Sequence, residues 1–352
     1  MLPLETSVFD GRQCVDAYLN GANFIGQDLT SRVVINTSLE QAEFTGAMLQ
    51  KSYFKACNLK GANFAAANLK SVSFYNCDLR GVNFCGALAE EVSFTECNLD
   101  GASFETVDLM QSSFNRVNLS GVNFSRANLC KSSLIECEMV NTNFSFANLE
   151  RLSAPRADFR KTKLLRNSFL KAYLVGSDFR GISFEGCDLT LTLFKKCLLD
   201  QASFSMMPLT QTQFSQASLI EASMEKASLH GTNFVAANLA SCNLSAASIN
   251  KVNATHGNFQ SVYAEHATLN RSVFKYANLS QSKWLQSSWT TCDISYALID
   301  KADFSFSHCF QLNTHAVDTH AAKWVDATLE KSITTDEARR RAELWTPSPI
   351  SH

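Results

Sequence analysis

The chain has 352 residues and a formal net charge of −2, and 45% of its residues are hydrophobic, 18% charged and 11% aromatic. No run of about 18 apolar residues occurs, so we expect no membrane span. The nearly balanced charge argues against a generic nucleic-acid binder, which would be strongly basic.

Residues 1–18 keep a partial apolar register, at Phe9 and Cys14, and are expected to start the coil described below. The first residues lack the basic and apolar stretches of a secretory signal. We therefore expect a cytoplasmic protein.

Residues 19–308 repeat with a period of five. Every fifth position from 19 to 304 is apolar, and only four of these 58 positions hold alanine. Of the 26 Phe, 22 fall on this register. Small residues predominate two positions before each of these apolar residues, and the position between the two is usually Asn, Asp or Ser. A period of five fits neither a helix nor a strand, so the chain is predicted to turn every five residues and to point two of every five side chains inward.

The motif small–Asn/Asp–Leu/Phe–x–x, as at residues 57–61 and 82–86, resembles that of the pentapeptide-repeat proteins over about residues 9–309. The resemblance implies an all-β solenoid, a right-handed quadrilateral β-helix with four repeats per coil. Such a solenoid would have about 14–15 coils here. Phe prefers positions ending in 4 and Leu those ending in 9, so each should line two opposite sides of a packed interior.

Residues 309–352 are expected to form an irregular C-terminal cap with a short α-helix near residues 335–345. The run from Thr334 to Glu337 has the pattern of a capping box, and Pro347 and Pro349 should stop the helix. Leu344 and Trp345 are expected to cover the last coil. The resemblance offers an alternative, because a C-terminal element makes a homodimer in several family members.

The sequence indicates no catalytic, cofactor or metal site. Eight of the 12 Cys occupy the small inward position, where Cys acts as an apolar filler; disulfides between stacked cysteines are the alternative. No C-x-x-C pair, phosphate loop or hydrolase motif is present. An enzyme would need a site around Cys309 and the histidines His308, His315 and His320. We expect these histidines to be solvated and the protein to be non-catalytic.

Charge is distributed unevenly along the repeat. An acidic collar within residues 85–110 has six acids and no Lys or Arg: Glu90, Glu91, Glu96, Asp100, Glu105 and Asp108. A basic collar within residues 150–171 has seven bases: Arg151, Arg156, Arg160, Lys161, Lys163, Arg166 and Lys171. Each run should wrap about one coil. The basic collar is either a solvated surface or a docking site for a protein partner, with the outward Phe146 as an apolar contact.

These features favour a protein-interaction scaffold whose partner is unidentified. The resemblance implies two specific roles. One is a bacterial adaptor or effector associated with a secretion system, such as the type VI apparatus. The alternative is a DNA mimic that binds DNA gyrase and confers quinolone resistance, against which the basic collar and the net charge of −2 both count. Direct binding of nucleic acid is not expected.

Overall fold

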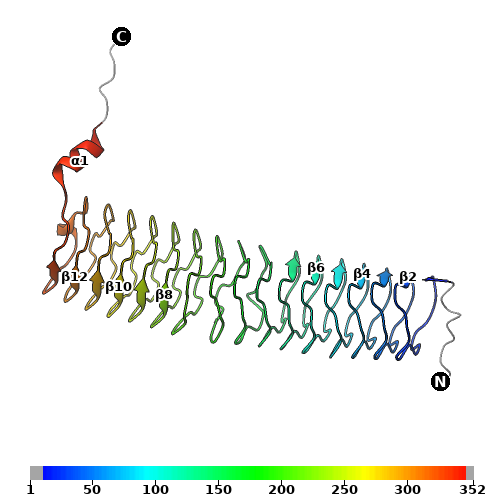
Figure 1. The fold of residues 1–352 in the computed structure, drawn as a ribbon. Helices are drawn as coiled ribbons and strands as arrows, with labels where there is room; N and C mark the ends of the chain where they lie inside the picture. The colour runs from blue at the N-terminus through cyan, green and yellow to red at the C-terminus, as the bar shows by residue number, and fades with distance from the viewer. Residues whose placement is uncertain (1–10, 346–352) are drawn as a thin grey trace, which may run out of the picture. The chain divides into compact units, whose positions relative to one another are not determined.

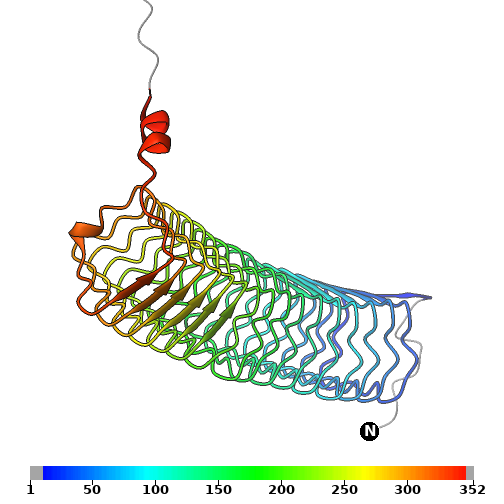
Figure 2. The same cartoon turned by 60° about the vertical axis from the view of Figure 1, so that its left-hand side comes forward.

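The structure is a computed structural model that describes residues 11–345 (Figures 1 and 2). Each coil takes 20 residues, because within each of two sheets every strand pairs in parallel with the next one along the chain, as Gln13 does with Val33. Isolated parallel pairs, such as Asn23 with Glu43, mark the other three sides of a coil. The predicted all-β solenoid is confirmed.

The chain divides into two compact units, Met1–Leu198 and Leu199–His352. In the first unit seven strands stack in chain order on one side of the coil (Figure 1). They are β1 (Gln13–Val15), β2 (Val33–Ile35), β3 (Tyr53–Lys55), β4 (Ser73–Tyr75), β5 (Ser93–Thr95), β6 (Ser113–Asn115) and β7 (Ser133–Ile135).

The second unit carries a six-stranded parallel sheet, whose strands lie side by side as arrows in Figure 2. They are β8 (Ser228–His230), β9 (Ser248–Asn250), β10 (Thr268–Asn270), β11 (Ser288–Thr290), β12 (His308–Phe310) and β13 (Thr328–Glu330). The 3-10 turn η2 (Thr319–Ala321) lies between β12 and β13, and the helix α1 (Glu337–Leu344) follows β13.

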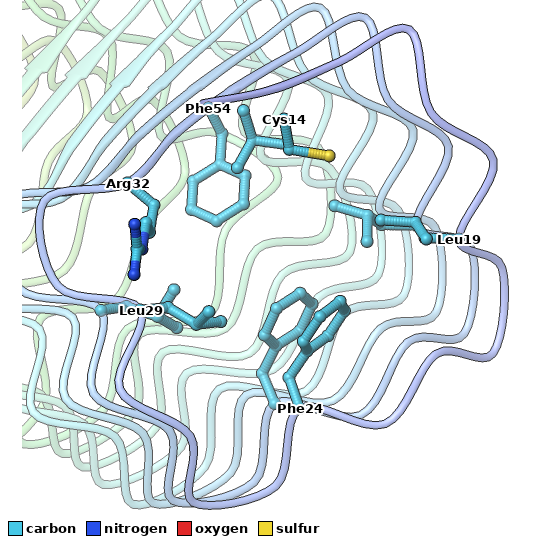
Figure 3. A pocket seen from close by; sticks show the side chains of 10 residues that line it. Cys14, Leu19, Phe24, Leu29, Arg32 and Phe54 are labelled. Carbon is cyan, nitrogen blue, oxygen red and sulfur yellow. The ribbon is translucent and has the colours of Figure 1, made fainter. Parts of the chain in front are cut away.

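The inward positions fill the coil with side chains. Phe24 stacks on Phe44 in the next coil with ring centroids 4.9 Å apart, and Phe44 meets Phe54 from the opposite side edge-on at 6.4 Å. Leu19 and Leu29 project from the two remaining sides (Figure 3). The expected alternation of Phe and Leu sides is therefore confirmed in the first coils.

The corners depend on a left-handed backbone conformation at almost every fifth residue, with Lys161 and Ala321 as exceptions within residues 11–331. The residues with positive φ all have numbers ending in 1 or 6, and they include Gly121 at 66° and Lys131 at 60°. Asn side chains brace the adjoining turns, since the Asn58 amide oxygen accepts a hydrogen bond from the Lys60 N–H at 3.2 Å. Asn ladders join coils as well: Asn83 donates to Asn63 at 3.1 Å.

The coil continues beyond residue 309. β13 pairs with β12, and Asn313 pairs with Ile333. The solenoid therefore has about 16 turns, slightly more than the sequence indicated, because the backbone pairing persists where the side-chain pattern fades. The expected register position Phe9 and the helix stop at Pro347 and Pro349 lie outside the described residues.

The predicted C-terminal helix is present as α1. Its N-cap is Asp336 and not Thr334, so the helix begins two residues later than the expected capping box requires. The Asp336 carboxylate accepts hydrogen bonds from the N–H groups of Ala338 and Arg339. Near the end of the solenoid the side chain of Trp324 points inward. Its ring stacks on that of Phe304, with the ring centroids 4.3 Å apart.

Candidate functional site

All seven bases of the basic collar are exposed, and they lie at different corners of the coil in the first unit. Arg151 and Lys171 are 20 residues apart and share one corner. Arg156, Lys161 and Arg166 each follow at the next corner along the chain, and Lys163 lies on the side between the last two. The collar therefore surrounds the coil, and no flat partner could contact all seven bases together.

Few of these bases are neutralised. Arg160 pairs with Asp158 at 2.7 Å and with Asp178 at 3.3 Å, and Arg151 lies 3.7 Å from Glu150. The Arg160 guanidinium holds the pKa of the Asp158 carboxyl below its usual range. Within residues 11–345, no ion pair is formed by the other five bases, Arg156, Lys161, Lys163, Arg166 and Lys171.

Three of the six acids of the acidic collar form ion pairs with bases one coil away. Lys70 pairs with Glu90 at 2.9 Å, Arg116 with Glu96 at 3.2 Å, and Arg126 with Glu105 at 3.5 Å. Exposed ion pairs of this kind contribute little stability, but they reduce the net field of the surface. The basic collar is consequently the stronger candidate for electrostatic docking.

The backbone is irregular within the collar. Asn167 occupies an inward position that small residues usually fill, and its side chain forms hydrogen bonds with three backbone groups. Its amide oxygen accepts from the Leu165 N–H at 2.9 Å, while its amide nitrogen donates to the carbonyls of Phe144 and Ala147. Leu165 is exposed beside Arg166. The five-residue pattern gives no signal for the hydrogen bonds of Asn167 to the backbone.

Phe146 lies at the same corner as Arg126 and Arg166, between them along the stack. Its side chain is 44% exposed, and the Arg126 guanidinium lies 5.8 Å from the ring centroid. The outward position predicted for Phe146 is confirmed. The surface around it combines an aromatic ring, the exposed Leu165 and two guanidinium groups.

The end of the first coil forms a small apolar pocket (Figure 3). Its walls are inward side chains of the core, including Cys14, Leu19 and Phe24. Arg32 takes the place of a small residue there and donates a hydrogen bond to the Gly11 carbonyl. The lining is a continuation of the packed interior and offers no set of convergent polar groups among the described residues.

At the C-terminal end, Leu344 and Trp345 are 64% and 71% exposed, so neither side chain packs on the last coil. α1 is attached by Glu343 instead. Its carboxylate accepts hydrogen bonds from the Tyr296 hydroxyl, from Arg339 Nε at 2.8 Å and from His315 Nε2 at 3.3 Å.

These bonds lower the pKa of Glu343 to about 2, the Tyr296 hydroxyl bond contributing most. The sequence did not reveal this attachment, since Tyr296 and Glu343 are 47 residues apart.

The histidines near the end of the solenoid do not converge. His308 and His320 are exposed as expected. The expectation of a solvated side chain was wrong for His315, which is buried because its ring nitrogens bond to Glu343 and to the Asp336 N–H. Within residues 11–345, no group of three or more His, Cys, Asp or Glu is placed to hold a metal ion. All the described cysteines are free thiols.

The five-residue register, the stacked four-sided coils and the Asn-braced corners recur in known proteins. A family model described as "Pentapeptide repeat region" matches residues 35–104 and 177–254, and one described as "Pentapeptide repeats (8 copies)" matches overlapping segments between residues 90 and 190. Together they span more than half of the chain. The chain belongs to the pentapeptide-repeat family.

Solved structures of this family are similar in fold. A trypsin-treated form of QnrB1, a plasmid-mediated fluoroquinolone resistance protein, is 23% identical, with 53% of this chain and 89% of that chain covered and a TM-score of 0.30. HetL, involved in heterocyst differentiation regulation in the cyanobacterium Nostoc sp. strain PCC 7120, is 18% identical, with 78% and 89% covered and a TM-score of 0.21. No curated protein matches the chain.

A third relative, a pentapeptide-repeat protein from the Arabidopsis thaliana thylakoid lumen, is 28% identical over 32% of this chain and 70% of that chain, with a TM-score of 0.17. These likenesses concern the fold. Among the described residues, no helix has the length and apolar character needed to cross a membrane.

Proposed function

We propose that the protein is a non-catalytic interaction scaffold that binds an acidic protein partner through its basic collar. The observation that carries the proposal is the contrast between the two collars. The acids Glu90, Glu96 and Glu105 are paired with bases one coil away, whereas five of the seven collar bases form no ion pair within residues 11–345. Cations that are exposed and unpaired can attract a partner of opposite charge and fix its orientation.

The repeat supports such a role because surface and core are separated by register. Outward residues can change without disturbing the stacked Phe and Leu side chains, so a surface can be adapted to one partner. A secretion-linked adaptor or effector would need a surface of this kind, and it is the specific role that we include in the proposal.

The test is an affinity pull-down from native lysate with three forms of the protein: wild type, a variant with the seven collar bases changed to Ser, and a charge-matched control. The control changes seven exposed bases outside the collar to Ser: Lys51, Lys55, Lys60, Lys251, Arg271, Lys301 and Lys323. We expect one protein to be retained by wild type and control and lost by the collar variant. Binding should then be reproduced with that protein purified.

Other outcomes would contradict the proposal. Equal retention of the captured protein by all three forms would show that the basic collar is only a solvated surface. Recovery of DNA gyrase subunits independent of the collar would favour the DNA-mimic alternative. Each variant should first be shown to unfold cooperatively near the wild-type temperature, so that a loss of binding is not a loss of fold.

A further inference from the structure

Three cations are stacked at one corner of the first unit, on consecutive coils. Lys131, Arg151 and Lys171 are each 20 residues apart, and each has a positive φ, of 60°, 55° and 57°. The backbone fixes their register, because the N–H groups of Lys131 and Arg151 donate to carbonyls of the next coil, Glu150 and Leu170, at 2.9 Å each. Stacked coils are about 4.8 Å apart, so the three positions form a cation ladder spanning about 10 Å.

The cation ladder is poorly compensated. At a neighbouring corner of the same unit, Arg116 lies between Glu96 and Glu136 and pairs with both at 3.2 Å. Within residues 11–345, only Arg151 of the cation ladder forms an ion pair, with Glu150 at 3.7 Å. No other ion pair involves these three cations among the residues that the structure describes. Like charges held this close repel one another, and an anionic ligand would relieve the repulsion.

The spacing of the cation ladder fits one face of an α-helix. Acidic residues at positions i, i+4 and i+7 of a helix lie on one face and span about 10.5 Å along its axis. This span differs from that of the three cations by about 1 Å, which flexible Lys and Arg side chains can accommodate. An extended strand fits less well, because its same-face residues are about 6.8 Å apart.

We propose that the cation ladder binds an acidic α-helix of the partner, with the helix axis parallel to the direction in which the coils stack. This inference rests on the proposed function and names the part of the collar that makes the contact, adding Lys131 to it. Tyr173 lies on the side that follows Lys171 and is 45% exposed. It supplies an apolar surface next to the cations for the flank of the helix.

The experiment uses two synthetic helical peptides of identical composition. One carries Glu at i, i+4 and i+7 on a single face, and the other has the same Glu residues distributed around the helix. Binding is measured by fluorescence anisotropy at low salt with the full-length protein. The ladder variant is Lys131→Ser, Arg151→Ser and Lys171→Ser. The matched control is Lys55→Ser, Lys60→Ser and Arg271→Ser, which removes the same charge from exposed positions outside the basic collar.

We expect the single-face peptide to bind wild type and control with similar affinity and to bind the ladder variant about tenfold more weakly, as three exposed charge pairs would give. The distributed peptide should bind all three proteins weakly. Equal loss in both variants, equal binding of both peptides, or no binding to wild type would overturn the inference. Tighter, ladder-dependent binding of a short DNA duplex would overturn it in favour of phosphate recognition.

The ladder variant in the pull-down separates this inference from the function on which it rests. Loss of the captured partner from the ladder variant supports both. If the ladder variant keeps a partner that the seven-base variant loses, the scaffold function stands and the helix-binding inference fails. If the seven-base variant also keeps the partner, the proposed function itself fails.

Discussion

Phe114 and Phe146 belong to the same residue type but to different register positions, and their environments differ completely. Phe114 is 0% exposed and stacks on Phe94 at 5.1 Å, whereas Phe146 is 44% exposed. We expect Phe114→Ala to lower the free energy of unfolding by about 3–5 kcal/mol, as for other buried aromatic residues. Phe146→Ala should change it by less than about 0.5 kcal/mol. Urea unfolding of both variants checks this, and equal losses would contradict the register.

Thiol reactivity provides a second test at the residue scale. Burial raises the pKa of the Cys242 thiol to about 12, while Cys130 is only partly buried, although burial raises its pKa as well. The thiolate is the reactive form, so a thiol reagent near pH 8 should modify Cys130 slowly and Cys242 only after unfolding. Mass spectrometry of labelled peptides gives both rates. Rapid labelling of Cys242 in the native protein would refute its role as a core filler. Cys130→Ser should remove the signal of the Cys130 peptide only, since Cys85 and Cys137 are partly buried as well.

The position of a side chain could be predicted where the repeat determines its contacts. It could not be predicted where the contact is with a residue outside the repeat pattern. The five-residue register correctly placed Phe114 inside and Phe146 outside. It also put small residues beside the core, and two of these, Ser282 and Ser287, accept hydrogen bonds from the indoles of Trp284 and Trp289 at 2.7 and 2.9 Å. That pairing has a local signal, a Ser two residues before each Trp, which the repeat alone does not single out.

Among the elements, α1 shows the same division between local and distant information. The N-cap Asp336 and its helix-forming successors are a local pattern, so the helix could be predicted from the sequence. The attachment of the helix through Glu343 to Tyr296 and His315 could not, because no periodicity relates these residues. Since Leu344 and Trp345 are exposed, the apolar character of the helix end was a poor guide to its contacts.

The attachment of α1 should depend on pH. The pKa of Glu343 is lowered to about 2 from an ordinary value of 4.5, so its ionised form stabilises the attached helix. This stabilisation is fully present above the ordinary value and is lost as the pH falls towards 2. We therefore expect the methyl NMR signals of Ala338 and Ala342 to stay in their native positions at neutral pH and to shift towards those of a detached helix below about pH 4.

A matched substitution controls for general acid unfolding. Glu343→Gln keeps the shape of the side chain but removes its charge, so α1 should be loosely attached at neutral pH and its signals should lose most of their pH dependence. Glu337 lies on the same helix, and no described residue forms an ion pair with its side chain. Glu337→Gln should therefore leave the attachment unchanged. An unaltered pH profile in Glu343→Gln would rule out Glu343 as the responsible group.

For the whole molecule, the coil is the unit that can be removed. Deleting residues 81–100 joins Arg80 to Gly101, and Gly101 then takes the corner of Gly81, which has a similar φ, 64° against 69°. The Phe and Leu columns are preserved, so we expect cooperative unfolding within a few degrees of wild type. Deleting only Asp100 shifts the next inward residues outward and should lower the melting temperature far more. Differential scanning calorimetry compares the two, and equal effects would contradict coil modularity.

The family and the architecture of the whole chain could be predicted because the same five-residue pattern recurs 58 times. The surface follows no such pattern. The sequence predicted that the run of seven bases would wrap about one coil, and the structure confirms this. The ion pairs of the collar could not be predicted, because Arg160 pairs with Asp178 of the next coil as well as with Asp158. Folding back every 20 residues brings together charges that are distant in sequence.

The Asn ladders have a direction. Asn83 donates its amide hydrogen to the oxygen of Asn63, Asn118 to Asn98, and Asn258 to Asn238, so in each case the later coil donates to the earlier one. A coil emerging from the ribosome therefore meets acceptors already held in place by the coil made before it. We therefore expect a nascent chain arrested at successive lengths to gain protease resistance one coil at a time.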